Sequence, residues 1–195
     1  MRLTRRGAIG AILATAASGA AVAQEKGAPK KGPAGPGLTL SSPDFQDGGI
    51  IPNKYTQAEA NPVSPKLEWT NVPPNTVSFV LYMHDPDTAG QRKIDDTLHW
   101  LILNIPGTAK ELPGNVNTDP KLPDGTIQLK NQGGVVGYRG PGAGAAGPYH
   151  HYTFELFALD TKLDLGPDAT RPDVLKAIDR HILGKGVLVG RFHRP

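Results

Sequence analysis

Histidine and aspartate gather at three places in the sequence, each at the end of an apolar or aromatic run. The residues concerned are His84, Asp85, Asp87, His99, His150 and His151. Side chains two apart on a strand point to the same face, so His150 and Tyr152 should share one face while His151 points away. If the three runs are neighbouring strands, these side chains converge on one rim. Imidazole and phenol groups there would donate hydrogen bonds to a phosphate or carboxylate.

The chemistry expected of this rim is anion binding by charged histidines. We expect His99 and His150 to act as imidazolium donors, and Asp85 to orient one of them and raise its pKa. The negative charge of Asp85 opposes an anion. Asp85 must therefore be neutralised by a histidine, be protonated, or face a cationic group such as ethanolamine. Affinity for a non-titrating anion such as sulfate is then expected to fall as rising pH removes the imidazolium charge. Affinity for a phosphate should instead pass through a maximum at about pH 6 to 7, because its second ionisation strengthens binding to a positive site.

Strands must position these side chains. The strongest strand signals cover 77–83, 98–105 and 152–159, and weaker ones cover 38–41, 67–70, 135–138 and 187–191. Long loops rich in proline and glycine join them. This pattern predicts a mainly β fold, either a sandwich or an open, barrel-like antiparallel sheet.

One helix is expected near the C-terminal end. Thr170 can cap it, and Pro172 and Asp173 suit its first turn. An apolar stripe at helical spacing follows, made of Val174, Leu175, Ile178, Ile182 and Leu183. Gly184 is the expected end of this helix, and its stripe should pack on the core.

Composition narrows the class of protein. The chain has 195 residues, 24 glycines, 19 prolines and no cysteine, which favours one loop-rich domain and excludes disulfides and thiolate metal sites. Lysine and arginine number 21 against 18 acidic residues, but Arg2, Arg5 and Arg6 account for the excess. Residues 38–195 carry 15 basic and 17 acidic side chains, so no nucleic-acid-binding surface is indicated.

The N-terminus has the features of an export signal. A basic segment ends at Arg6, a run of apolar and small residues follows, and Ala21-Val22-Ala23 forms a cleavage site before Gln24. The Arg5-Arg6 pair partly resembles a twin-arginine signal. We therefore expect residues 1–23 to be removed, residues 24–37 to form a flexible linker, and residues 38–195 to form the domain. The mature protein is expected in the periplasm or outside the cell, as a monomer or weak dimer.

Four motifs carry a family resemblance. They are Asp85-Pro86-Asp87; His99-Trp100-Leu101 leading into Asn104-Ile105-Pro106-Gly107; Tyr138-Arg139-Gly140-Pro141; and His150-His151-Tyr152-Thr153-Phe154 leading into Phe157-Ala158-Leu159-Asp160. In this order they resemble the phosphatidylethanolamine-binding protein family, which includes the Raf kinase inhibitor proteins, and residues 177–194 resemble its bacterial branch. The chain departs from the family pattern where Thr88-Ala89 follows Asp87, where His151 stands for an arginine, and where the glycine-rich stretch 142–147 replaces a proline-rich turn.

The resemblance implies a large central antiparallel sheet, a smaller second sheet and short C-terminal helices. It also implies a metal-free pocket, needing no cofactor, for phosphate-like groups such as phospholipid headgroups. Carried over to this sequence, the ligand-binding residues are Asp85, His99, Pro141, His150 and Tyr152, with Asp87 holding the loop.

Two other functions remain open from the residues. An inhibitor or regulator of a partner protein is the first alternative, because some relatives inhibit kinases or proteases; no partner is identified by the sequence. A metal-dependent hydrolase is the second, since the histidines and aspartates include possible metal ligands. Against an enzyme, the chain has no HExxH motif, no P-loop and no G-x-S-x-G serine. A binding protein is the favoured interpretation.

Overall fold

The computed structural model describes residues 37–89 and 95–195. Within these ranges the domain is mainly β, which confirms the predicted fold class. Its strands are β1 (Thr39–Ser41), β2 (Gly49–Ile50), β3 (Leu67–Thr70), β4 (Ser78–Asp85), β5 (Thr97–Pro106), β6 (Glu111–Leu112), β7 (Ile127–Gln128), β8 (His150–Leu159) and β9 (Ile182–Phe192). The helices are α1 (Arg171–Ala177) and the 3₁₀ turns η1 (Asn53–Tyr55) and η2 (Pro86–Thr88). The expected export signal, and the linker up to residue 36, lie outside the described residues.

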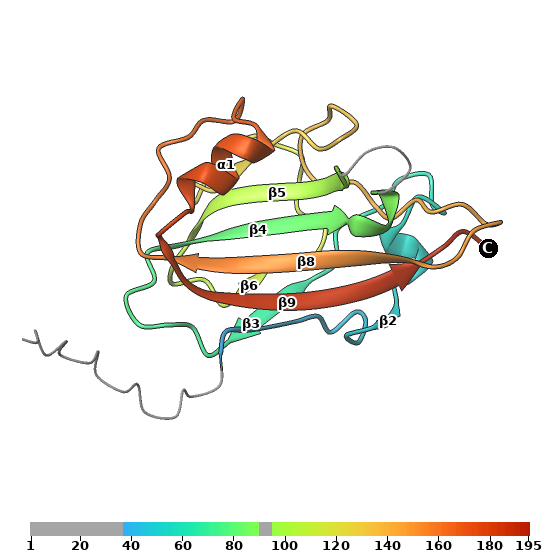
Figure 1. Ribbon diagram of the computed structural model, residues 1–195, viewed down its shortest axis with the longest axis horizontal. Coiled ribbons are helices and arrows are strands. Elements are labelled where there is room, and N and C mark those ends of the chain that lie inside the picture. The colour runs from blue at the N-terminus through green and yellow to red at the C-terminus, as the bar shows by residue number, and fades with distance from the viewer. Residues whose placement is uncertain (1–36, 90–94) are drawn as a thin grey trace, which may run out of the picture. The chain divides into compact units, whose positions relative to one another are not determined.

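Two sheets make up the domain. The larger has the strand order β2-β9-β8-β4-β5-β7 and the smaller has the order β1-β3-β6. Figure 1 shows β5, β4, β8 and β9 side by side, with β3 and β6 behind them. All pairings are antiparallel except that of β2 with β9. The expected antiparallel sheet is therefore mixed, because this two-residue strand runs parallel to the edge of the larger sheet.

Both faces of the larger sheet are covered, which explains why its central strands are almost continuously apolar. Along β4, Phe79, Leu81 and Met83 join one core cluster with residues of the smaller sheet. Val80 and Tyr82 join a second cluster that includes Val174 and Ile178 of the α1 region. The last two residues of β4 continue this alternation, so His84 and Asp85 point to opposite faces.

The C-terminal helix is shorter than predicted. Thr170 caps it as expected, in a capping box with Asp173. The helix ends at Ala177, however, and Arg180 turns the chain with a positive φ of 67°. Ile182 then begins β9, where it pairs with Leu159. The predicted stripe was wrong beyond Ile178, because pairing with β8 overrides the helical spacing of Ile182 and Leu183.

The predicted strand at 135–138 was also wrong. Val136 forms only an isolated bridge with Lys130, and Val135 is 62% exposed. Gly134 and Gly137, on either side, have positive φ values of 76° and 91°. These left-handed positions turn the backbone too sharply for a continuous strand. The loop-rich stretch 107–134 contains the short strands β6 and β7.

Candidate functional site

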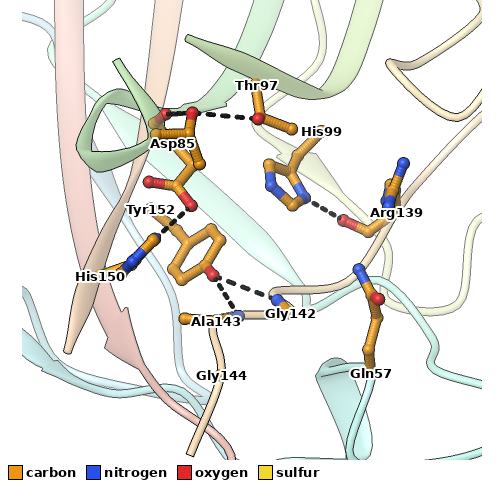
Figure 2. A pocket seen from close by; sticks show the side chains of 11 residues that line it. Gln57, Asp85, Thr97, His99, Arg139, Gly142, Ala143, Gly144, His150 and Tyr152 are labelled. Atoms are coloured by element: carbon orange, nitrogen blue, oxygen red, sulfur yellow. Dashed lines mark hydrogen bonds and ion pairs between the residues drawn. The ribbon is translucent and has the colours of Figure 1, made fainter. Parts of the chain in front are cut away.

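The expected convergence of polar side chains lies where three strands meet. β4 lies between β8 and β5 in the larger sheet. The end of β4 supplies Asp85, the start of β8 supplies His150 and Tyr152, and the start of β5 supplies His99. These four side chains surround a cavity of about 290 Å³ (Figure 2). The cavity lies on the face covered by the smaller sheet, because Asp85 follows the alternation of Leu81 and Met83.

A β-bulge aims His99 into the cavity. On β4, His84 pairs with Leu98 and the preceding residue, Met83, pairs with Trp100, which leaves His99 as the extra residue on β5. A bulge of this kind places two successive side chains on one side of a strand. Trp100 therefore enters the core on the same side on which His99 lines the cavity. Regular alternation would have sent one of them to the opposite face.

Asp85 and His150 form a pair at the wall of the cavity. The carboxylate is only 2% exposed, and its Oδ2 lies 2.8 Å from Nδ1 of His150. Its Oδ1 accepts a hydrogen bond from the backbone N–H of Asp87 at 3.0 Å. Asp85 therefore orients an imidazole, as expected from the sequence, and that imidazole is His150.

His99 differs from the expectation in its charge. Its Nδ1–H donates to the backbone carbonyl of Arg139 at 2.8 Å. The side chain is 3% exposed, and burial lowers the pKa of His99 despite the opposing influence of that hydrogen bond and of the Asp85 charge. Burial therefore opposes the imidazolium that the sequence predicted at His99. In the neutral ring with a proton on Nδ1, Nε2 offers a lone pair.

Tyr152 holds the glycine-rich segment and keeps its own proton. Its hydroxyl oxygen accepts hydrogen bonds from the backbone N–H groups of Gly142 and Ala143, at 3.1 and 3.0 Å. Burial raises the pKa of Tyr152 to about 12, so the hydroxyl is neutral in the physiological range. The hydroxyl also lies within hydrogen-bonding reach of Asp85, whose charge adds to the rise in the pKa of Tyr152. Its ring meets the edge of His99 at a centroid distance of 5.1 Å.

Other residues of the wall were not predicted as site residues. They are Gln57, Thr88, Thr97, Arg139, Gly142, Ala143 and Gly144. Gln57 donates from Nε2 to the carbonyl of Gly140 at 2.7 Å, and no local motif signals this contact across 83 residues of sequence. A Cβ at Gly140 would come within 2.7 Å of the Tyr55 carbonyl oxygen, so glycine permits this close approach.

Two predicted site residues lie beside the cavity rather than in its wall. The buried Pro141 contributes its backbone carbonyl, which accepts from the Gln57 N–H at 2.8 Å. Asp87 is half-exposed and accepts hydrogen bonds from the backbone N–H of His151 at 2.5 Å and from its Nδ1 at 2.9 Å. These bonds connect η2 to the start of β8. They also lower the pKa of Asp87, although its partial burial acts in the opposite direction.

Among the described residues, no three His, Asp or Glu side chains are grouped closely enough to hold a metal ion. His84 points to the opposite face of the sheet, where it pairs with Asp96. His181 pairs with Asp160 at 2.7 Å and is about half exposed.

Comparison with known proteins identifies the family. The family model for phosphatidylethanolamine-binding protein matches residues 41–193, nearly the whole described domain. The chain belongs to this family. A UPF0098 protein of Methanothermobacter thermautotrophicus is 40% identical over 157 residues, which is 80% of this chain and 99% of that protein. The putative lipoprotein LppC of Mycobacterium tuberculosis is 36% identical over 161 residues, 82% of this chain and 74% of that protein.

Solved structures of family members share the fold. Those of E. coli YbcL and of the phosphatidylethanolamine-binding protein homologue CT736 of Chlamydia trachomatis superpose with TM-scores of 0.71 and 0.70. Their identities to this chain are 25% and 28%. Each match covers 82% of this chain, with 100% of YbcL and 99% of CT736. In the part of the chain that the structure describes, no helix has the length and apolar character needed to cross a membrane.

Proposed function

We propose that this family member is a periplasmic or secreted binding protein whose metal-free pocket takes a small anionic or phosphorylated molecule, such as a phospholipid headgroup. The observation that carries the proposal is the Asp85–His150 pair, which borders an open cavity together with Tyr152 and His99. Converging polar groups at one concave site are the usual feature of a small-molecule site.

The size of the cavity supports a headgroup rather than a whole lipid. A volume of about 290 Å³ lies at the lower end of the range for small-molecule sites. Its wall carries histidine, aspartate, threonine and tyrosine side chains and the backbone of the glycine-rich segment. Such a wall suits a phosphorylated headgroup, whereas acyl chains would require an apolar extension.

The proposed export rests on the N-terminal sequence. The basic start, the apolar run and the Ala21-Val22-Ala23 site are the three parts of a cleavable signal. The relative named as a putative lipoprotein is consistent with a location in the cell envelope. Intact mass spectrometry of the protein from periplasm should show loss of the first 23 residues.

Calorimetric titration with phosphoethanolamine tests the proposed ligand class. We expect binding by the unmutated protein and a loss of about tenfold in affinity for His150→Ala, because that side chain lines the cavity and orients Asp85. His181→Ala is the matched control, since it removes an imidazole that pairs with Asp160 outside the cavity wall. An equal loss in both variants, or no binding by the unmutated protein, would contradict the proposal.

A further inference from the structure

The wall of the pocket presents hydrogen-bond acceptors where an anion-binding site would be expected to present donors. Nδ1–H of His99 donates to the Arg139 carbonyl, and no described residue forms a hydrogen bond with Nε2. Figure 2 shows the ring between Arg139 and Asp85, with one nitrogen bonded to the Arg139 carbonyl. A neutral imidazole whose Nδ1 carries the proton has an accepting Nε2. A ligand that reaches this atom must bring a proton of its own.

Asp85 gives a second reason why the pocket should prefer a protonated ligand to a fully ionised one. Its buried carboxylate carries a negative charge at the wall of the cavity, where it pairs with the ring of His150, while Arg139 supplies the fixed positive charge of the wall. A second negative charge on the ligand would therefore be repelled at close range in a site of low dielectric. Tyr152 keeps its proton, but its hydroxyl lies within hydrogen-bonding reach of Asp85, which also raises its pKa. The wall at His99 and Asp85 thus suits a ligand that brings a donating hydroxyl together with its negative charge.

We propose that the pocket selects the singly protonated form of a phosphomonoester, whose P–OH donates to Nε2 of His99. This inference rests on the proposed function and specifies the protonation state of its ligand. A phosphomonoester loses this proton near pH 6, so a large fraction of free ligand at neutral pH is the disfavoured dianion. Affinity should therefore fall as pH rises through the second ionisation of the ligand.

The titratable groups facing His99 bear on this pH dependence. They are Asp85 on β4, His150 and Tyr152 on β8, and Arg139 in the segment before the glycine-rich stretch. Tyr152 and Arg139 do not change charge between pH 5 and 8. His150 is the other imidazole in the wall, so the experiment must separate effects of the protein from the ionisation of the ligand.

A comparison of methyl phosphate with methyl sulfate separates the titration of the ligand from that of the protein. The two have nearly the same shape, but methyl sulfate is a monoanion without a proton throughout the range. Any titration of the protein alters both affinities, whereas only methyl phosphate loses a donor. We expect methyl phosphate to bind about fivefold tighter at pH 5, the value of one ordinary hydrogen bond. This ratio should fall to one or below by pH 8.

A ratio that is constant or rises between pH 5 and 8 would overturn the inference. If the constant ratio came with a loss of both affinities in His150→Ala, the proposed ligand class would stand and the selectivity alone would fail. If neither compound nor phosphoethanolamine bound at any pH, both proposals would fail.

Two further measurements address His99 directly. The ³¹P chemical shift of bound methyl phosphate should titrate at a higher pH than that of the free compound, and an unchanged or lower midpoint contradicts the inference. This measurement uses the unmutated protein, so it stands even if a variant fails to fold. In His99→Gln, the side-chain amide offers a donor as well as an acceptor, and the pH dependence of the phosphate-to-sulfate ratio should disappear.

Discussion

The two faces of the larger sheet each carry a histidine–aspartate pair at the end of β4, but the surroundings of the pairs differ. On the α1 face, Nδ1 of His84 pairs with one oxygen of Asp96, and Arg171 at the start of α1 pairs with the other. Arg171 also donates to the Tyr82 hydroxyl at 2.9 Å, and the ring of Tyr82 stacks on His84 at 4.4 Å. On the pocket face, the Asp85–His150 pair borders the cavity.

This difference separates a structural network from a binding site built from the same residue types. One oxygen of Asp96 pairs with His84 on β4 and the other with Arg171 at the start of α1, so this network connects α1 to β4 and contributes to packing. Hydrogen bonds from His84 and Arg171 hold the pKa of Asp96 below its usual value, although burial acts in the opposite direction. Nε2 of His84 is buried without a hydrogen-bond partner among the described residues, whereas the ring of His99 lines a cavity that a ligand can enter. Unused hydrogen-bonding capacity at an accessible cavity is available for a ligand.

The largest expected effect is on the α1 face. Asp96→Asn removes the shared charge and leaves His84 and Arg171, both largely buried, without their counter-ion. We expect the free energy of unfolding to fall by about 3 kcal/mol, because breaking a mostly buried ion pair leaves an uncompensated charge. Urea denaturation measures this loss. Affinity for phosphoethanolamine should remain within about twofold, since the network lies across the sheet from the pocket.

Asp160→Asn is the control for this prediction. It removes the partner of His181 from a pair in which each side chain is about half exposed. Exposed pairs contribute little, so its effect should be below about 1 kcal/mol. If Asp96→Asn and Asp160→Asn had the same effect, or if Asp96→Asn abolished ligand binding, the division between the two faces would be incorrect.

A smaller loss of stability is expected in the pocket. Tyr152→Phe removes the oxygen that accepts from Gly142 and Ala143 and leaves their two N–H groups without this partner. Unsatisfied donors cost about 1–3 kcal/mol, and we expect about 2 kcal/mol together with faster hydrogen exchange at both amides. Unlike Asp96→Asn, this variant should also lose phosphoethanolamine affinity, by about tenfold. Retained affinity with exchange unchanged would exclude Tyr152 as the support of the glycine-rich segment.

The sequence predicted the strands that carry the pocket because burial on both faces makes them strongly apolar. β4, β5 and β8 follow from such runs, and the family motifs place Asp85, His99, His150 and Tyr152 at their ends. Local spacing could not predict the helix end, because the pairing of Ile182 with Leu159 is a long-range contact. β2, β6 and β7 are only two residues long, too short to give a periodic signal.

The chemistry of the pocket was less predictable than its location. The β-bulge at His99 depends on the register between β4 and β5, which no local pattern shows. The charge of His99 depends on how deeply the ring is buried, and the sequence only indicated that carboxylates were near. Gln57 reaches the pocket through tertiary folding alone. Residue types therefore located the site, whereas burial and register determined its protonation state.

The smallest predicted effect is a pH dependence of stability that originates at His99. Burial lowers the pKa of His99 in the folded protein below the value of about 6.5 expected for an unfolded chain. The unfolded state then binds a proton that the folded state does not. Stability from this group is complete above about pH 6.5 and falls as the pH drops toward the folded-state pKa, with a slope of at most about 1.4 kcal/mol per pH unit.

Urea denaturation of the ligand-free protein at several pH values between 5 and 8, compared with His99→Gln, isolates this contribution. Every other titratable group is present in both proteins, so the difference between the two pH profiles reports on residue 99. The unmutated protein should lose more stability on acidification than the variant, because only it carries the buried imidazole. Parallel curves would show that His99 is protonated as easily in the folded as in the unfolded chain. In that case Nε2 of His99 would carry a proton at mildly acidic pH. The ring would then be the imidazolium donor to an anion that the sequence analysis predicted.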